Sequence, residues 1–210
     1  MEIRRDKYLN DLVVRKGNEM IKVVTGIRRC GKTYLVFDLF VRHLIKSGVP
    51  EDHIITLALD DRANVRYRDV DALYDYLMER IGNDQGVYYV LLDEIQYAIT
   101  VKELRSKDEP PALYGVLNGL LHRRNVDVYV TGSNSKLLST DVMTEFRGRG
   151  DEVRIHPLTF AEFMQAFDGD RQAGWAEYVM YGGLPLTLSM HTPEQKASYL
   201  TGLFEEVYLS

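Results

Sequence analysis

The chain has 210 residues, of which 45% are hydrophobic and 27% charged, and this predicts a soluble globular protein with one core and a small appendage. Its formal net charge of −5 gives no sign of a nucleic-acid coat or an anionic membrane partner, and no apolar run reaches the length of a membrane span. A single cysteine, five histidines without ligand spacing and an N-terminus without an apolar signal core lead us to expect a cytoplasmic protein without disulfide or structural metal.

The first elements predicted are a helix, a strand and a second helix. Residues from about 4 to 19 mix charged and apolar side chains and predict a short helix beside the first strand. The β-branched stretch 20–25 predicts that strand. Apolar residues recur at helical spacing from Leu35 to Ile45, and Gly48 and Pro50 should end this helix.

Between that strand and helix lies the stretch 26–33, which matches the phosphate-loop pattern G-x-x-x-x-G-K-[ST] in full. Gly26 and Gly31 let the backbone approach a phosphate closely, and the N–H groups that follow form an anion cradle. Lys32 supplies a charge for the β- and γ-phosphates, and Thr33 supplies a hydroxyl for Mg²⁺. The residues expected to bind ATP are Gly26, Ile27, Arg28, Arg29, Cys30, Gly31, Lys32, Thr33 and Tyr34.

A second buried strand is predicted at 53–58, and it ends in Asp60 and Asp61. An outer-shell contact to magnesium or water is one interpretation of this pair. A solvated turn is the favoured one, because turns attract aspartate. Asp69 is the predicted N-cap of the next helix, which should close at Gly82.

The continuous apolar run 87–92 followed by Asp93 and Glu94 is typical of a central parallel strand. Ligands of α/β sheets bind at the carboxyl ends of the strands, where both acids would lie. If Lys32 is a phosphate ligand, Asp93 would hold Mg²⁺ through water, together with Thr33, and Glu94 would orient the attacking water. The alternative is that the two acids only end a strand.

The remaining part of the core is predicted to hold a loop, a helix and two strands. Most of 101–111 is expected to be a loop, followed by a helix at 113–122 and strands at 126–131 and 153–155. Asn134 or Ser133, after the fourth strand, could hydrogen-bond the γ-phosphate or the attacking water, or simply form a turn. Arg147 and Arg149 are candidate arginine fingers, acting in the same chain or on a neighbouring subunit, or solvated loop charges.

After Pro157 the pattern changes to short helices. Capping boxes begin at Thr159 and Thr192, with the sharp break Gly182-Gly183-Leu184-Pro185 between them. The last helix has no stop signal before Ser210. We therefore expect a core over 1–157, short helices over 158–210 and a longer natural protein that is cut at or just after the last helix.

Together these blocks resemble the prokaryotic AAA-like ATPases, in which an N-terminal AAA domain precedes a C-terminal domain of unknown function. The resemblance implies ATP binding with magnesium, hydrolysis, and an AAA core with a small helical lid. The motifs that carry it are the phosphate loop, Leu92-Asp93-Glu94-Ile95-Gln96, Thr131-Gly132-Ser133-Asn134, Arg147-Gly148-Arg149, the run 157–163 and Gly182-Gly183-Leu184-Pro185.

The sequence thus predicts an α/β fold, a three-layer P-loop NTPase core with a mainly parallel five-stranded sheet and a C-terminal helical lid. The leading hypothesis is an ATPase that acts on an unknown protein or nucleic-acid partner, with a homo-oligomer if the arginine comes from a neighbouring subunit. An ATP-gated binding switch with little hydrolysis is the alternative. A small-molecule kinase is a third, and Asp93-Glu94 at a central strand argues against it.

Overall fold

The computed structural model describes residues 2–82, 85–105, 109–132 and 149–208, and divides them into two compact units. The first consists of residues 1–6, 27–31 and 156–210, and the second of residues 7–26 and 32–155. We call the first the helical unit and the second the sheet unit. Residues 27–31 of the phosphate loop group with the helical unit, whereas Gly26, Lys32 and Thr33 belong to the sheet unit.

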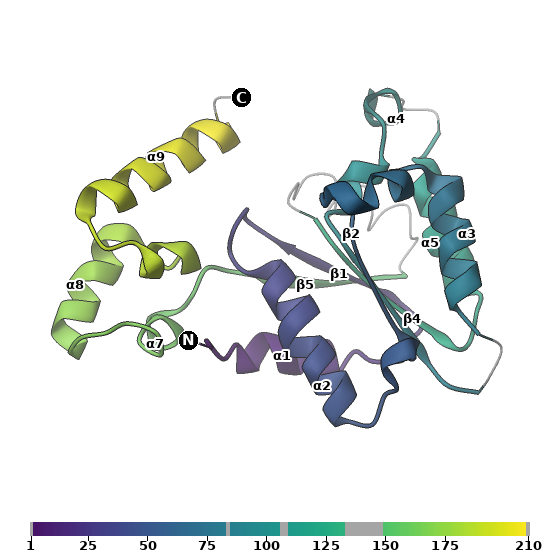
Figure 1. Cartoon of the computed structure of the whole chain (residues 1–210), viewed down its shortest axis with the longest axis horizontal. Helices are drawn as coiled ribbons and strands as arrows, with labels where there is room; N and C mark the ends of the chain where they lie inside the picture. Colours follow the sequence, from purple (N-terminus) through teal and green to yellow (C-terminus); the bar gives the residue numbers. More distant parts are fainter. Residues whose placement is uncertain (1, 83–84, 106–108, 133–148, 209–210) are drawn as a thin grey trace. The chain divides into compact units, whose positions relative to one another are not determined.

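The sheet unit is built on five parallel strands in the order β2-β3-β4-β1-β5 (Figure 1). This confirms the predicted five-stranded α/β core, and every described pairing is parallel. Although β1 precedes β3 in the chain, β4 lies between them in the sheet. The strands are β1 (Ile21–Gly26), β2 (Ile54–Ala58), β3 (Tyr88–Asp93), β4 (Val126–Thr131) and β5 (Gly150–Ile155).

Helices cover both faces of this sheet, which gives the three predicted layers (Figure 1). Strand β4 illustrates the alternation of side chains between the faces. Val128 and Val130 belong to the core cluster that packs under α3 and α5, whereas the Tyr129 ring lies 4.7 Å from that of Phe40 on the opposite face. The two layers contain α1 (Asp6–Val13), the π-helical segment η1 (Tyr34–Phe40) and α2 (Val41–Lys46) on one side, and α3 (Val70–Arg80) and α5 (Ala112–Leu121) on the other.

Short elements connect these layers, and one of them differs from the prediction. The stretch 101–111, expected to be mostly loop, begins with the helix α4 (Val101–Arg105). Thr100 and Glu103 form reciprocal hydrogen bonds there, because the Thr100 N–H donates to Glu103 at 2.7 Å and the Glu103 N–H donates to the Thr100 hydroxyl at 3.2 Å. The other short elements are the 3₁₀ turns η2 (Glu51–His53), η3 (Arg62–Arg68) and η4 (Ile95–Ala98).

A buried ion pair joins β1 to β4 near the amino ends of the two strands. Lys22 is fully buried, and its ammonium donates to Asp127 and to the Met20 carbonyl, the latter at 2.9 Å. Asp127 also accepts from the Gly17 N–H at 3.0 Å and from the Tyr129 hydroxyl at 3.2 Å. Both charges are therefore satisfied inside the core, as a buried pair requires.

The helical unit packs around aromatic side chains. Phe163 and Tyr178 meet edge to face at 5.4 Å, and the Tyr178 hydroxyl donates to the Leu158 carbonyl at 2.9 Å. The capping boxes predicted at Thr159 and Thr192 are both present. Gly183 passes so close to Leu158 that a Cβ would stand 2.1 Å from its carbonyl oxygen. The elements of this unit are α7 (Phe160–Phe163), α8 (Arg171–Tyr181), the 3₁₀ turn η6 (Pro185–Ser189) and α9 (Pro193–Tyr208).

Candidate functional site

The site begins where β1 ends, at the glycine that opens the phosphate loop. Gly26 and Gly31 have φ angles of 151° and 97°, which favour glycine, so both predicted glycines occupy positions that need one. The Lys32 side chain is 4% exposed, and its ammonium donates to the Gly26 carbonyl at 3.0 Å. The lysine is thus folded back over the start of the loop, as a phosphate ligand would be.

The Thr33 hydroxyl faces the carboxylate at the end of β3. It donates to Asp93 Oδ2 at 2.6 Å, although the two residues lie on elements separated by β4. Asp93 is 1% exposed, and its other carboxylate oxygen accepts a hydrogen bond from the Thr131 hydroxyl at the end of β4. Three segments far apart in sequence therefore meet at the carboxyl edge of the sheet, where sequence analysis placed the site.

Glu94 takes a left-handed backbone conformation, with φ 54° and ψ 51°, immediately after β3. Such a conformation is uncommon for a residue other than glycine and marks a local constraint. Its N–H donates to the Thr131 hydroxyl at 3.2 Å, and its carboxylate accepts from the Gln96 side-chain amide. Backbone and side chain of Glu94 are thus both held in place.

Burial governs the ionisation of Asp93. Loss of hydration raises the pKa of this carboxyl above its ordinary value, and the neighbouring charges of Glu94 and Asp60 raise it further. Hydrogen bonds from Thr131 and Thr33 act in the opposite direction, because they stabilise the carboxylate. A cation at this carboxylate would favour its ionised form, since an opposite charge lowers a carboxyl pKa.

The residues present fit a magnesium ion. Mg²⁺ prefers hard oxygen ligands and is bound in proteins by one or two such groups together with substrate phosphates and water. The Thr33 hydroxyl and the Asp93 carboxylate supply such oxygens 2.6 Å apart, and Lys32 lies one residue before Thr33. Magnesium bound there would neutralise charge on the phosphates of a nucleotide.

Arg28, Arg29 and Cys30 of the phosphate loop belong to the helical unit and contact other residues of that unit. Arg28 forms an ion pair with Glu206 of α9, and the Arg29 guanidinium lies 5.5 Å from the centre of the Tyr199 ring. Cys30 is buried, and its carbonyl accepts a hydrogen bond from Arg5 at 2.9 Å. Ile27 is exposed, and Tyr34 is half-buried at the start of η1.

The structure places one of the remaining predicted site residues, Arg149, and does not describe the others. Ser133, Asn134 and Arg147 lie outside the residues that the structure describes. Arg149 is described, and its carbonyl accepts from the Ile21 N–H at 2.8 Å, beside the amino ends of β1 and β5. That is the opposite edge of the parallel sheet from Asp93, so a role for Arg149 as an arginine finger would require a neighbouring subunit.

Thr131 and Gln96 are the site residues that sequence reasoning did not assign. A threonine at the end of a β-branched run gives no signal of its own. Only its alignment beside β3, which the sequence does not specify, places its hydroxyl between Asp93 and Glu94. Gln96 follows the acids by two residues, and this proximity was a signal, but its bond to Glu94 emerges only from the turn η4.

Comparison with known sequences identifies a family and two relatives. A family model described as "AAA domain" matches residues 18–164. An uncharacterized protein of Haemophilus influenzae is 30% identical over 213 residues, which cover 99% of this chain and 50% of that protein. An uncharacterized protein of Methanocaldococcus jannaschii is 27% identical over 222 residues, which cover 96% of this chain and 45% of that protein. The chain thus spans about half the length of these relatives.

Solved structures share the fold at low sequence identity. The Walker-type ATPase PABY2304 of Pyrococcus abyssi matches with a TM-score of 0.57 and 17% identity, over 89% of this chain and 65% of that one. The Hsp104–ADP complex of Saccharomyces cerevisiae matches with a TM-score of 0.61 and 14% identity, over 90% and 30% of the two chains. Among the helices that the structure describes, none has the length and apolarity needed to cross a membrane.

Proposed function

Because the chain belongs to the AAA domain family, whose model matches residues 18–164, we propose that it binds Mg-ATP at residues 26–33 and hydrolyses it to ADP and phosphate. The loop N–H groups and Lys32 would bind the phosphates. Glu94 would orient and polarise the attacking water. Hydrolysis would drive a conformational change that acts on a protein or nucleic-acid partner.

The observation that carries this proposal is the meeting of Thr33 with Asp93. A loop that only turned a strand into a helix would not require its threonine to reach a buried carboxylate two strands away. Phosphoryl transfer depends on positioning and on neutralisation of charge more than on covalent chemistry. The arrangement of Lys32, Thr33 and Asp93 supports both.

Glu94 supports hydrolysis rather than binding alone. Its left-handed backbone and its bond to Gln96 fix a carboxylate one residue beyond the metal ligand. A fixed base can orient water without first losing rotational freedom, and general base catalysis contributes about 10²- to 10⁴-fold to a rate. The hydrogen bond from Gln96 would hold the Glu94 carboxylate in place until the attacking water and the nucleotide compete with Gln96 for that carboxylate.

The test is phosphate release from Mg-ATP across protein concentration, together with equilibrium binding of ATP. Lys32→Ala should abolish both binding and turnover. Glu94→Gln should bind ATP at parent affinity and lose about a hundredfold or more in turnover. Lys46→Ala, an exposed lysine at the end of α2, is the matched control and should behave as the parent.

Each result separates the alternatives. Turnover per chain that rises with concentration would support a homo-oligomer with a shared site and an arginine from the neighbouring subunit. ATP binding without turnover at any concentration would refute the ATPase and favour the ATP-gated switch. Transfer of phosphate to an acceptor other than water would instead indicate a kinase.

A further inference from the structure

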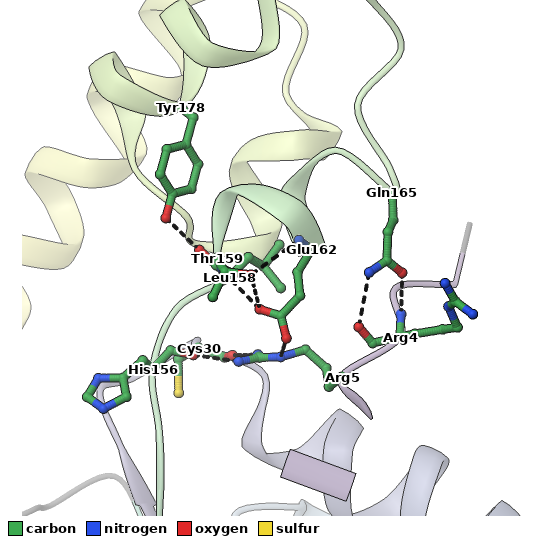
Figure 2. Close-up of polar contacts among 9 residues, drawn as sticks. All are labelled: Arg4, Arg5, Cys30, His156, Leu158, Thr159, Glu162, Gln165 and Tyr178. Carbon is green, nitrogen blue, oxygen red and sulfur yellow. Dashed lines mark hydrogen bonds and ion pairs between the residues drawn. The ribbon is translucent and has the colours of Figure 1, made fainter. Parts of the chain in front are cut away.

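Arg5 is a buried arginine that lies outside every motif. It is 3% exposed, and Figure 2 shows its guanidinium in the middle of a network of polar contacts. Arginine remains charged at all physiological pH values, and burial of its charge is costly unless acceptors surround it. The position of Arg5 therefore depends on the groups that accept its hydrogen bonds.

The three guanidinium nitrogens bond three different segments of the helical unit. Nη1 donates to the Cys30 carbonyl in the phosphate loop at 2.9 Å, and Nη2 donates to the His156 carbonyl after β5 at 2.7 Å. Nε donates to the Glu162 carboxylate in α7 at 3.0 Å. The planar fork of arginine fixes the directions of all three bonds, which a lysine ammonium cannot reproduce.

The partner on α7 is itself fixed. Glu162 accepts from Arg5 with one oxygen, and its other oxygen accepts from the Thr159 N–H at 2.8 Å in the capping box. The backbone of Arg4 also bonds Gln165 at 2.8 and 3.3 Å (Figure 2). The segment that carries Arg5 is thus tied to α7 through Glu162 and to the turn after α7 through Gln165, so Arg5 connects that helix to the phosphate loop.

The bond to Cys30 has a consequence for the next amide. A trans peptide unit is planar, so the Cys30 carbonyl and the Gly31 N–H point in opposite directions. With the carbonyl held on Arg5, the Gly31 N–H is turned away from Arg5. Gly31 allows this orientation with a φ of 97°, a value that other residues rarely adopt.

We propose that Arg5 is a positioning residue for the phosphate loop, which holds the Cys30–Gly31 peptide so that the Gly31 N–H faces the phosphates of a bound nucleotide. This inference rests on the nucleotide binding proposed above. Because Glu162 holds Arg5, the first helix of the helical unit is coupled to the loop through one guanidinium. A shift of α7 would therefore alter nucleotide affinity.

The first measurement needs no nucleotide and uses Cys30, the only cysteine of the chain, which is fully buried. The rate at which a thiol reagent modifies Cys30 reports local opening of the loop. In Arg5→Lys this rate should rise about tenfold, because a charge-assisted hydrogen bond to the loop backbone is lost. Glu162→Gln should change the rate in the same direction by a smaller factor.

The second measurement is the affinity for ADP, at a temperature where thermal unfolding shows every variant to be folded. Arg5→Lys should weaken ADP binding about tenfold. A residue that served stability alone would lower the unfolding midpoint and leave this affinity unchanged. Arg4→Lys, at an exposed neighbouring position, is the control and should match the parent in both measurements.

The outcomes separate this inference from the proposed function. If the parent binds ADP and Arg5→Lys binds it equally well, the positioning role of Arg5 is refuted and nucleotide binding stands. If the parent binds neither ADP nor ATP, the proposed function fails, and the role of Arg5 toward phosphates fails with it. Faster Cys30 modification together with weaker ADP binding, in Arg5→Lys but not in Arg4→Lys, supports the inference.

Discussion

Replacement of Thr131 by valine tests whether the end of β4 organises the two acids. Valine has nearly the shape of threonine, so the change removes a hydroxyl without opening a cavity. The Thr131 hydroxyl is fully buried, donates to Asp93 and accepts from the Glu94 N–H at 3.2 Å. Thr131→Val therefore removes one donor from a buried carboxylate and one acceptor from a backbone amide.

The magnitude follows from these two bonds. A hydrogen bond to a charged group contributes about 1.5–3 kcal/mol, and a neutral one about 1 kcal/mol. Together they predict a loss of about 3 kcal/mol in the free energy of unfolding, without nucleotide and at a pH where the Asp93 carboxyl is ionised. This is a large share of the roughly 5–15 kcal/mol that stabilises a typical domain.

The loss should depend on pH through Asp93. Burial raises the folded pKa of this carboxyl above its ordinary value, so its ionisation destabilises the folded state above that pKa. The Thr131 bond lowers this pKa and reduces that penalty, and its removal raises the pKa further. The difference in the free energy of unfolding between parent and variant is therefore largest above the folded pKa of Asp93. It becomes smaller as pH falls through that pKa.

Urea unfolding of parent and Thr131→Val across pH measures both effects. Thr56→Val, at an exposed threonine of β2, is the control and should stay within about 0.5 kcal/mol of the parent. In an Asp93→Asn background, Thr131→Val should cost less, because the buried charge is gone. Equal losses for Thr131→Val and Thr56→Val, or a loss independent of pH, would refute this reading of the site.

Two further predictions concern stability. Lys22→Met should lower the free energy of unfolding by about 3–5 kcal/mol, because it leaves the Asp127 charge buried without its cation, and Asp127→Asn in the same chain should recover most of the loss in urea unfolding. Gly183→Ala should lower the thermal midpoint by several degrees, because its Cβ would stand 2.1 Å from the Leu158 carbonyl oxygen. Gly115→Ala, which meets open space in α5, should instead stabilise by up to about 1 kcal/mol, and equal effects of the two glycine changes would contradict the close approach at Gly183.

Features encoded within a short stretch of chain were predictable from the sequence. The strand before residues 26–33 and the helical segment after them follow from local pattern, and Asp69 caps its helix by accepting from Ala72 N–H at 2.9 Å, as its position predicted. The helix α4 was missed although Thr100 and Glu103 have capping-box spacing, because Pro110 and the polar composition of the segment favoured a loop. The capping-box spacing thus indicated a helix, but the proline and the polar composition were given more weight.

Features that depend on pairing between distant segments were not predictable. Apolar runs indicate strands but carry no information about their order, so the position of β4 between β1 and β3 was unknown. Without that order, Thr131 had no identifiable role. Arg5 is a charged residue near the N-terminus, where solvent exposure is the usual expectation, and only the tertiary fold supplies its three acceptors.

The strand order also sets a sequence of events during synthesis of the chain. Both strands that pair with β1 come much later in the chain. Lys22 of β1 pairs with Tyr129 of β4, and Ile21 of β1 pairs with Gly150 of β5. More than a hundred residues must therefore leave the ribosome before β1 gains any strand partner. Strands β2 and β3 can pair earlier, whereas β1 remains an apolar edge open to aggregation. The central pairing that assembles the proposed nucleotide site is thus among the last to form, and its long loop closure should make it slow.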